Sequence, residues 1–504
     1  MKRNFIAKRF QSAGTGLTLD TAALAKYKDI VDLSIGDTDF TTDEAIINAA
    51  FRDAKAGYTH YGDPKGDPEL ISAVCKAWEE DFDQSLPRDH VLVSASSCLG
   101  MSLAMFAILD PGDEVIVFSP YFALYRAQIE LAGGVCVDVP TYAEEDYAIS
   151  EERLRAAITP RTKAIIFNNP TNPTGMGYDL STMEMLARVA KEYDLLIAAD
   201  EIYTTYIYEG DFRPIRTLPG MAERTITLNS FSKNFLMTGW RVGVIIAEPE
   251  FLDVMNRING SLVYSAPSIS QRAGIQALAM RKEIREKYVT AYRDRIFYSA
   301  DRIEKIPYLS LVRPKGTFYL FPGVEKTGLD DKQFCKELLE RAHVLVSAGS
   351  PFGKTGANHF RIACTVSIDQ LKQAFDRKLT ALGLTTQQSF VLRYLYEHSE
   401  EKVYPKDIEK RFDLTHPTVS GLIQRLEAKD FVVCEPDDDD HRCKRIRMTQ
   451  KAETCQQEIF RHILSTERIL TAGMSPEEVE TFLRLLSLAN DNLCAELQKE
   501  ESEQ

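Results

Sequence analysis

The sequence predicts an α/β body with a mostly parallel sheet of seven strands, then a smaller α+β lobe and an α-rich C-terminal domain. Short apolar runs alternate with helical patterns in the first half of the chain, which is typical of a sheet covered on both faces. Near Pro267 the pattern changes to a long helix of mixed charge and scattered strands. Near Gly383 it changes again, to short helices that precede two strands. A chain of 504 residues is long enough for several domains.

Seven apolar runs define the predicted sheet of the body. Helical patterns lie between most of them, so we expect right-handed crossovers and a ligand at the carboxyl ends of the strands. A further short strand at 31–36 ends in a glycine. The seven runs are residues 91–93, 114–118, 135–137, 164–167, 195–198, 225–228 and 242–246.

A second lobe is expected after residue 266. The large domain is therefore placed at about 46–266, and the small domain at about 1–45 and 267–382. The elements expected in the second lobe are one helix over 267–302, strands at 309–312 and 318–321, a helix over 331–342, a strand at 359–363 and a helix over 368–382.

The C-terminal domain, residues 383–504, is expected to be a winged helix-turn-helix. Three helical segments precede two β-rich runs that flank an acidic turn at 437–440, and this order is typical of the motif. Two long helical patterns then close the chain. The expected elements are helices from 384, at 404–412 and at 415–429, strands at 431–434 and 444–448, and helices at 450–472 and 476–499.

The charge balance argues against generic nucleic-acid binding by a positively charged surface over the whole protein, because 60 basic and 74 acidic residues give a formal charge of -14. The nine cysteines form no C-x-x-C pair and no cluster at zinc spacing, so we expect free thiols, no metal site and a reducing cytoplasm. We find no secretion signal and no run of ~18 to 20 apolar residues, so no membrane partner is expected.

The segment 230–243 carries the clearest chemical signal. Lys233 lies between two predicted strands, with Ser230 and Ser232 before it and Arg241 eight residues after it. A deprotonated lysine forms a Schiff base with a carbonyl, and serine hydroxyls with an arginine suit a phosphate. These residues predict a seat for pyridoxal phosphate, with Lys233 on the aldehyde and the other three on the phosphate.

Two further motifs follow strands at the same edge of the predicted sheet. Asn172 comes after the run 164–167, and Asp200 and Tyr203 come after 195–198. A carboxylate at Asp200 would hold the pyridine nitrogen protonated and make the ring an electron sink, while Asn172 and Tyr203 would hydrogen-bond the ring 3-hydroxyl oxygen. A helix N-cap at Asp200 and a plain turn at Asn172 are the structural alternatives.

In this order, the motifs resemble those of the class I/II pyridoxal-phosphate aminotransferases, which have the fold-type I architecture of aspartate aminotransferase. The resemblance covers residues 1–382. It implies that Lys233 moves the proton between the substrate α-carbon and the cofactor, that Asp200 pairs with the ring nitrogen, and that Arg361 clamps the substrate α-carboxylate. The matching pieces are Asn-Pro-Thr-Gly at 172–175, Asp200 with Tyr203, Ser-x-Ser-Lys at 230–233 with Arg241, and Arg361 in the strand 359–363.

The same resemblance assigns residues elsewhere in the body. Phe122 fits the aromatic residue that stacks on the cofactor ring, where tryptophan is common. Tyr61 fits the tyrosine lent across a dimer interface to the partner's phosphate, and Gly36 fits the glycine near the substrate carboxylate.

The phosphate loop departs from the family. Residues 94–98 read Ser-Ala-Ser-Ser-Cys, where relatives often carry glycines or a lysine. A helix that begins here still offers its amides to the phosphate, with Ser96, Ser97 and Cys98 at its start. The Cys98 thiol is either inert or redox-sensitive.

The C-terminal domain resembles the MarR family of regulators. Leu-Thr-x-Gln-Gln at 384–388, Pro-Thr-Val-Ser at 417–420 and Asp440 with Arg442 carry the resemblance. It implies a recognition helix in the major groove of double-stranded DNA and a wing arginine in the minor groove. A winged helix used only for protein contacts is the alternative. The residues expected to contact DNA are Thr418, Ser420, Gln424, Arg425, Arg442, Lys444 and Arg445.

Together, the two resemblances predict a cytoplasmic homodimer that transfers an amino group from an amino acid to a 2-oxo acid and binds DNA through its C-terminal domains. Two other functions remain open. One is a transcription regulator whose aminotransferase-like body senses pyridoxal phosphate or an amino acid, and the other is a pyridoxal-phosphate-dependent carbon–sulfur β-lyase. No arginine is assigned by spacing to a distal carboxylate, so the substrate side chain is not predicted.

Overall fold

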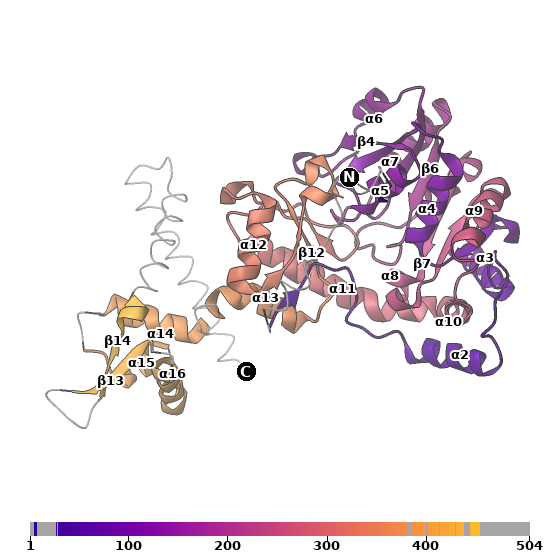
Figure 1. Cartoon of the computed structure of the whole chain (residues 1–504). Helices are drawn as coiled ribbons and strands as arrows, with labels where there is room; N and C mark the ends of the chain where they lie inside the picture. The colour runs from indigo at the N-terminus through magenta and orange to yellow at the C-terminus, as the bar shows by residue number, and fades with distance from the viewer. Residues whose placement is uncertain are drawn as a thin grey trace. The chain divides into compact units, whose positions relative to one another are not determined.

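The structure is a computed structural model that describes residues 5–7, 27, 29–380, 386–399, 402–412, 414–428, 430–437 and 444–453 (Figure 1). The chain divides into two compact units, Met1–Phe375 and Asp376–Gln504. Among the described residues, no helix is long and apolar enough to cross a membrane.

The first unit contains the predicted seven-stranded sheet. Its strands are β2 (Val91–Ser94), β3 (Glu114–Ser119), β4 (Val135–Pro140), β5 (Thr162–Asn168), β6 (Leu196–Asp200), β7 (Thr225–Ser230) and β8 (Gly243–Ile246). Their order across the sheet is β2-β8-β7-β6-β5-β3-β4. β3 to β7 are parallel, whereas β8 is antiparallel to both β2 and β7. The prediction of a mostly parallel sheet is confirmed.

Helices cover both faces of this sheet (Figure 1). They are α3 (Pro68–Phe82), α4 (Ser97–Ile108), α5 (Leu124–Leu131), α6 (Glu151–Ala157), α7 (Leu180–Glu192) and α9 (Pro249–Leu262). On β2, Leu92 packs in a cluster with α4, α5 and α9, while Val91 and Val93 belong to a different cluster with α3. Helices α6 and α7 share a third cluster with β5 and β6. Because both faces of the central strands are buried, these strands are rich in apolar residues.

Two helices, α10 (Ser268–Ala279) and α11 (Arg281–Glu304), replace the single helix expected over 267–302, so that prediction was wrong. The helix breaks at Met280, where φ is -98° and ψ is 8°. No glycine or proline marks this break in the sequence. Helix α10 packs against α2 (Glu44–Lys55) and α3, whereas α11 continues into the small lobe, so tertiary packing sets the break.

The small lobe carries two short sheets. Strand β1 (Val31–Asp32) pairs with β10 (Val344–Leu345), and β9 (Tyr319–Leu320) and β11 (Ser347–Ala348) flank β12 (Phe360–Ala363). Helices α12 (Asp331–Ala342) and α13 (Ile368–Thr380) form as expected. Residues 309–312 form one bridge, from Ser310 to Gly323, and the strand predicted there was wrong. A segment with high β-propensity forms a strand only where a neighbouring strand can hydrogen-bond to its backbone.

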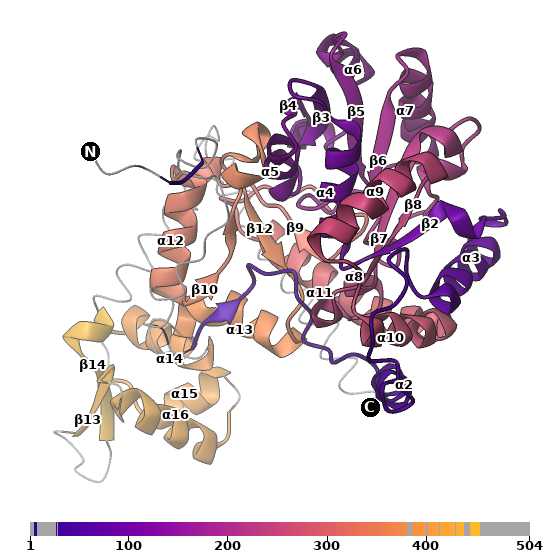
Figure 2. The ribbon, with the colours of Figure 1, turned by 45° about the vertical axis from the view of Figure 1, so that its right-hand side comes forward.

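The second unit has the predicted order of a winged helix-turn-helix (Figure 2). Helices α14 (Thr386–Glu397), α15 (Pro405–Phe412) and α16 (His416–Ala428) precede the antiparallel strands β13 (Val432–Pro436) and β14 (Lys444–Met448). Leu392, Ile408 and Leu426 contribute to a common buried core. Most of the acidic turn, Arg442 and the closing helices expected beyond residue 453 lie outside the described residues.

Candidate functional site

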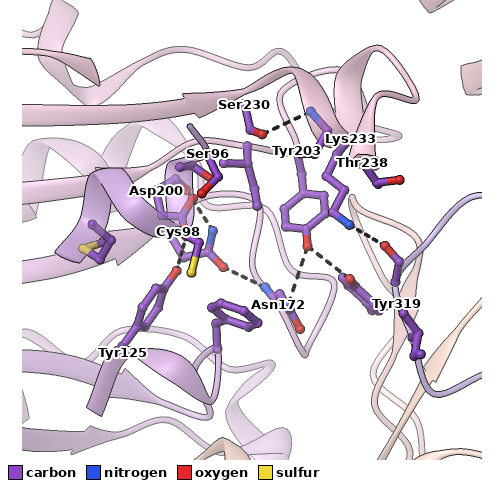
Figure 3. Close-up of a pocket in the computed structure, with 18 of the residues that line it drawn as sticks. Ser96, Cys98, Tyr125, Asn172, Asp200, Tyr203, Ser230, Lys233, Thr238 and Tyr319 are labelled. Atoms are coloured by element: carbon purple, nitrogen blue, oxygen red, sulfur yellow. Dashed lines mark hydrogen bonds between the residues drawn. The ribbon is translucent and has the colours of Figure 1, made fainter. Parts of the chain in front are cut away.

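A cavity of about 520 Å³ lies beside the carboxyl ends of β5, β6 and β7 and also reaches β12 (Figure 3). It brings together residues that lie up to 327 positions apart in the chain, from Ser34 to Arg361. Tyr61 is the one predicted cofactor residue that does not line it. The predicted residues that do are Gly36, Ser96, Ser97, Cys98, Phe122, Asn172, Asp200, Tyr203, Ser230, Ser232, Lys233, Arg241 and Arg361.

Lys233 projects into this cavity from a one-turn helix, α8 (Phe231–Asn234), that directly follows β7. The helix begins because Ser230 Oγ accepts a hydrogen bond from the Ser232 backbone N–H at 3.1 Å. Lys233 Nζ donates to the carbonyl oxygen of Gly36, and it lies 6.0 Å from the centre of the Phe318 ring. A primary amine is therefore held between one backbone carbonyl oxygen and an aromatic face, inside the cavity.

The start of α4 and the end of β7 form a polar corner of the cavity. Ser96 caps α4, since its Oγ accepts from the Leu99 backbone N–H at 3.0 Å. β8 comes so close that a Cβ added at Gly243 would lie 2.6 Å from the Ser97 nitrogen, which requires glycine there. Arg241 has φ +57° and its Nη1 donates to the Thr238 carbonyl at 2.8 Å. Hydroxyls, helix amides and a guanidinium together suit a phosphate.

Asp200 ends β6 and is 7% exposed. Its Oδ2 accepts a hydrogen bond from the Tyr125 hydroxyl (Figure 3), whereas its Oδ1 is buried with no partner among the described residues. Burial raises the pKa of Asp200 to about 6, against the lowering effect of the Tyr125 hydrogen bond. The carboxylate bonds a phenol and not a backbone amide, so the helix-cap alternative does not apply.

Asn172, Tyr203 and Tyr319 form a chain of hydrogen bonds, and the two tyrosines lie toward Lys233 (Figure 3). Asn172 Nδ2 donates to the Tyr203 hydroxyl at 3.5 Å, and the hydroxyls of Tyr203 and Tyr319 are 3.1 Å apart. Burial raises the pKa of Tyr203 well above its usual value, so this phenol is neutral. A Cβ added at Gly36 would lie 1.8 Å from the Tyr319 hydroxyl oxygen, so the glycine is needed for this close approach.

Arg361 lies on β12 and is 5% exposed. Its Nη1 donates to Asn172 Oδ1 at 3.0 Å, and its Nη2 donates to the Ser34 carbonyl at 2.6 Å. The guanidinium carbon is 4.6 Å from the Tyr319 ring centre and 4.9 Å from that of Phe352. Two aromatic faces therefore hold the guanidinium plane, which is the fork that matches a carboxylate.

The Cys98 thiol lies at the same end of the cavity as Asp200 (Figure 3). Gln128 Nε2 donates to Cys98 Sγ at 3.5 Å. Burial and the charge of Asp200 raise the pKa of this thiol, so it is protonated at neutral pH. Of the two alternatives for Cys98, the inert thiol fits these surroundings better, because reactive cysteines have lowered pKa values.

Tyr61 is 87% exposed and its ring centre is 5.0 Å from that of Tyr264. Leu262 and Val263, just before Tyr264, are exposed as well, at 55% and 44%. We call these four residues the α9 patch. Such a group of large apolar side chains on the surface is typical of a protein interface.

In the second unit, Thr418, Gln424 and Arg425 are exposed on α16, and Ser420 is half-buried. They lie opposite the buried residues of the same helix, which include Val419 and Leu426. On β14, Lys444 is exposed, while Arg445 pairs with Glu435 at 3.1 Å. Arg447 also contacts Glu435, at 3.5 Å, so one carboxylate forms ion pairs with two arginines of β14.

The sequence did not single out two tyrosines of the cavity. Tyr125 bonds Asp200, which is 75 positions away, and Tyr319 bonds Tyr203, which is 116 positions away. The local sequence around either tyrosine does not indicate that its hydroxyl has a polar partner. The available signal was position alone, since Tyr125 follows the predicted stacking residue Phe122 by one helical turn.

Two family models match this chain. Aminotransferase class I and II matches residues 28–377, and the MarR family matches residues 382–442. An aspartate/prephenate aminotransferase of Thermus thermophilus is 37% identical over 359 residues, which are 70% of this chain and 91% of the relative. An arginine–pyruvate transaminase of Pseudomonas aeruginosa is 33% identical over 356 residues, 71% of this chain and 91% of the relative.

Solved structures agree with the sequence matches. The aspartate aminotransferase from Thermus thermophilus with maleate superimposes with a TM-score of 0.71 at 33% identity. The alignment covers 75% of this chain and 100% of that one. The likeness therefore extends over the part of the chain that carries the cavity.

Proposed function

Because this chain belongs to the class I and II aminotransferase family and carries a MarR-family segment after it, we propose that it exchanges amino groups between amino acids and 2-oxo acids in the cavity of its first unit. The cofactor of such aminotransferases is pyridoxal phosphate. The observation that carries the proposal is that one cavity holds both Lys233 and a buried carboxylate, Asp200, that keeps one oxygen without a partner among the described residues.

The residues of the cavity fit this cofactor. Asp200 Oδ1 is an acceptor that a pyridinium N–H would satisfy. We assign the ring 3-hydroxyl to Asn172 and Tyr203, and the ring face to Phe122. We assign the phosphate to Ser96, Ser97, Cys98, Ser230, Ser232 and Arg241, which line the polar corner. When bound, the cofactor supplies an electron sink for negative charge at the substrate α-carbon.

The chain's own groups supply binding and proton transfer. Arg361 binds the α-carboxylate of the substrate and thereby orients the α-carbon toward Lys233. Lys233 Nζ would remove the proton from that carbon and deliver it to the bound cofactor, and it would move a proton in the opposite direction when a 2-oxo acid accepts the amino group. Asp200 would stay ionised beside a cationic ring nitrogen, because a nearby opposite charge favours the carboxylate. Tyr203 and Asn172 hold the ring in place through its 3-hydroxyl oxygen.

A panel of amino acids with a 2-oxo acid acceptor tests the proposal. The full chain with pyridoxal phosphate should form the 2-oxo acid of the donor and the amino acid of the acceptor in equal amounts. Binding of an amino acid without turnover would identify a sensor instead. Release of ammonia, pyruvate and a thiol from a cysteine conjugate would identify the β-lyase.

Replacement of Arg361 by lysine should raise the KM for every amino acid tested by at least about tenfold, because lysine lacks the planar fork that engages both carboxylate oxygens. Steady-state kinetics with donors of different side chains checks this. Lys354, an exposed cation seven residues before Arg361, is the control, and Lys354→Ala should leave KM unchanged. An effect confined to one donor class would mean that Arg361 contacts side chains.

We also propose that the protein is a homodimer and that the α9 patch, which includes Tyr61, lies in the interface. The exposed apolar side chains of the patch support this arrangement, and Tyr61 would then reach the phosphate of the partner's cofactor. Tyr61→Phe should weaken pyridoxal phosphate binding severalfold without changing the dimer mass. Light scattering and cofactor titration check both parts, and a monomer at micromolar concentration would contradict the proposal.

The described cysteines support a reducing location. Cys75, Cys98, Cys136, Cys335, Cys364 and Cys434 are all free thiols. Thiols of this kind persist in the cytoplasm, which we propose as the location.

For the second unit we propose binding to double-stranded DNA through α16, with Thr418, Ser420, Gln424 and Arg425 toward the major groove. Lys444 and Arg445 would contact phosphates, and Arg442 the minor groove. A two-fold dimer presents two such helices, which read one palindrome when they lie about 34 Å apart.

A DNA titration of the holoenzyme should show sequence-preferring binding whose affinity changes when an amino acid saturates the cavity. The sequence that follows α13 has no Gly/Ser-rich linker, and on this ground we propose that a shift of α13 on ligand binding changes DNA affinity. Linkage then requires DNA to change amino acid affinity by the same factor. Identical isotherms with and without amino acid, at fixed salt, would contradict coupling. Equal affinity for all DNA sequences would contradict specific recognition.

A further inference from the structure

The hydrogen bond between Tyr125 and Asp200 gives the carboxylate two unlike oxygens. Tyr125 lies in the first turn of α5, is 2% exposed, and donates its hydroxyl hydrogen to Asp200 Oδ2. Asp200 Oδ1 is buried and has no partner among the described residues. One oxygen is thus bound to the protein, and the other is available to whatever occupies the cavity.

We propose that Tyr125 is a positioning residue for the reaction, which holds the carboxylate of Asp200 in the orientation and the ionisation state that the pyridine nitrogen of the cofactor requires. This inference rests on the proposed function. The carboxylate of an aspartate rotates easily about its last bond, because that torsion has broad minima. A buried phenol that cannot reach water fixes that rotation when it bonds one oxygen.

The surroundings of Tyr125 keep it in this position. Its ring packs edge-on against Phe122 at a centroid distance of 5.6 Å, and Phe122 is the residue we assign to the face of the cofactor ring. On the same helix, Gln128 Nε2 donates to the carbonyl oxygen of Cys98 at 2.8 Å. Helix α5 is therefore tied to the start of α4, and one helix supports both the ring face and the carboxylate.

Of the titratable groups around Asp200, Tyr125 is the one whose hydrogen bond favours the ionised carboxylate. The hydroxyl of Tyr203 and the thiol of Cys98 face the pair, and burial raises the pKa of each, so both are neutral. The charge of Arg241 lowers the pKa of the Cys98 thiol. The side chain of Glu201 accepts from the Ile215 N–H at 3.1 Å, and burial raises its pKa to about 8. Only the Tyr125 hydrogen bond lowers the pKa of Asp200.

The test is the substitution Tyr125→Phe, read out by the pyridoxal phosphate dissociation constant of the apoenzyme as a function of pH. Loss of the donor raises the pKa of Asp200, so the carboxylate protonates at higher pH. The midpoint of the pH profile should rise by about one unit, the shift expected from one hydrogen bond to a charged group. The ratio of the variant's dissociation constant to that of the wild type should be about fivefold at pH 6 and one at pH 9.

Tyr121→Phe is the matched control. Tyr121 is a buried tyrosine four residues earlier in the chain, and its hydroxyl contacts Arg126 and Asp138 instead of Asp200. Its pH profile should match that of the wild type. In an Asp200→Asn background, Tyr125→Phe should shift nothing, because the titrating group is gone.

Two results would overturn the role of Tyr125. One is a Tyr125→Phe profile with the wild-type midpoint, and the other is a loss of affinity that is equal at all pH values, as a packing defect would give. Cofactor binding by the wild type with no pH midpoint assignable to Asp200 would also overturn it. Absence of cofactor binding in the wild type itself would instead contradict the proposed function.

Discussion

Replacement of Lys233 by alanine abolishes amino-group transfer and the visible absorbance of a lysine-bound cofactor. Lys233 is the lysine that lines the cavity among the described residues, so no neighbouring amine replaces it as Schiff-base partner or as proton carrier. The loss of both roles should lower turnover by at least about 10⁴-fold. Borohydride reduction followed by peptide mapping measures the covalent bond directly.

Lys163→Ala is the control for this experiment. Lys163 lies near the start of β5, at the opposite end of the strand from the cavity, and pairs with Asp113 at 3.0 Å. Its removal should leave both absorbance and turnover unchanged. A reducible cofactor adduct that survives in the Lys233→Ala variant would show that another lysine carries the cofactor.

Replacement of Asp200 by asparagine should lower turnover by at least about 10²-fold while the cofactor still binds. An amide oxygen can still accept from Tyr125, so the cavity keeps its shape, but an amide cannot hold the pyridinium proton. Single-turnover rates with one amino acid check this expectation. Near-normal rates would mean that the ring nitrogen does not need Asp200.

The same substitution should stabilise the apoenzyme above pH 6. The pKa of Asp200 is 3.8 in the unfolded chain and about 6 in the folded one, so the folded state binds the proton more tightly. The cost of the buried charge is therefore absent below pH 4, develops between pH 4 and 6, and is complete above pH 6. It amounts to about 3 kcal/mol at most. Urea denaturation of apo Asp200→Asn at pH 5 and pH 8 should show the larger gain at pH 8.

The body was predictable because its signals are local. Parallel strands that are buried on both faces read as uninterrupted apolar runs, and the polar motifs that follow them must meet at one edge of the sheet. Asn172, Asp200 and Lys233 were therefore placed correctly beside one cavity from their order in the chain.

What remained hidden depends on contacts between distant segments. The break at Met280 carries no glycine or proline and follows from the different partners of α10 and α11. The chain segment at 309–312 is apolar enough for a strand but finds only a single bridge. The partners of Asp200 and Tyr203, which are Tyr125 and Tyr319, come from other elements, and a sequence pattern does not encode such pairs.

Under the proposed DNA binding, Glu435 would compete with DNA phosphates for the basic side chains of β14. Its carboxylate lies within 3.1 Å of Arg445 and 3.5 Å of Arg447, so two guanidinium groups of β14 share one negative charge. A phosphate that approaches this strand would have to replace the ion pairs of Glu435. Non-specific DNA, which makes few other contacts, would gain little binding free energy from that replacement. Under the proposed DNA binding, a phosphate contact on β14 would cost the ion pairs of Glu435, and this cost would favour sites where α16 also makes base contacts.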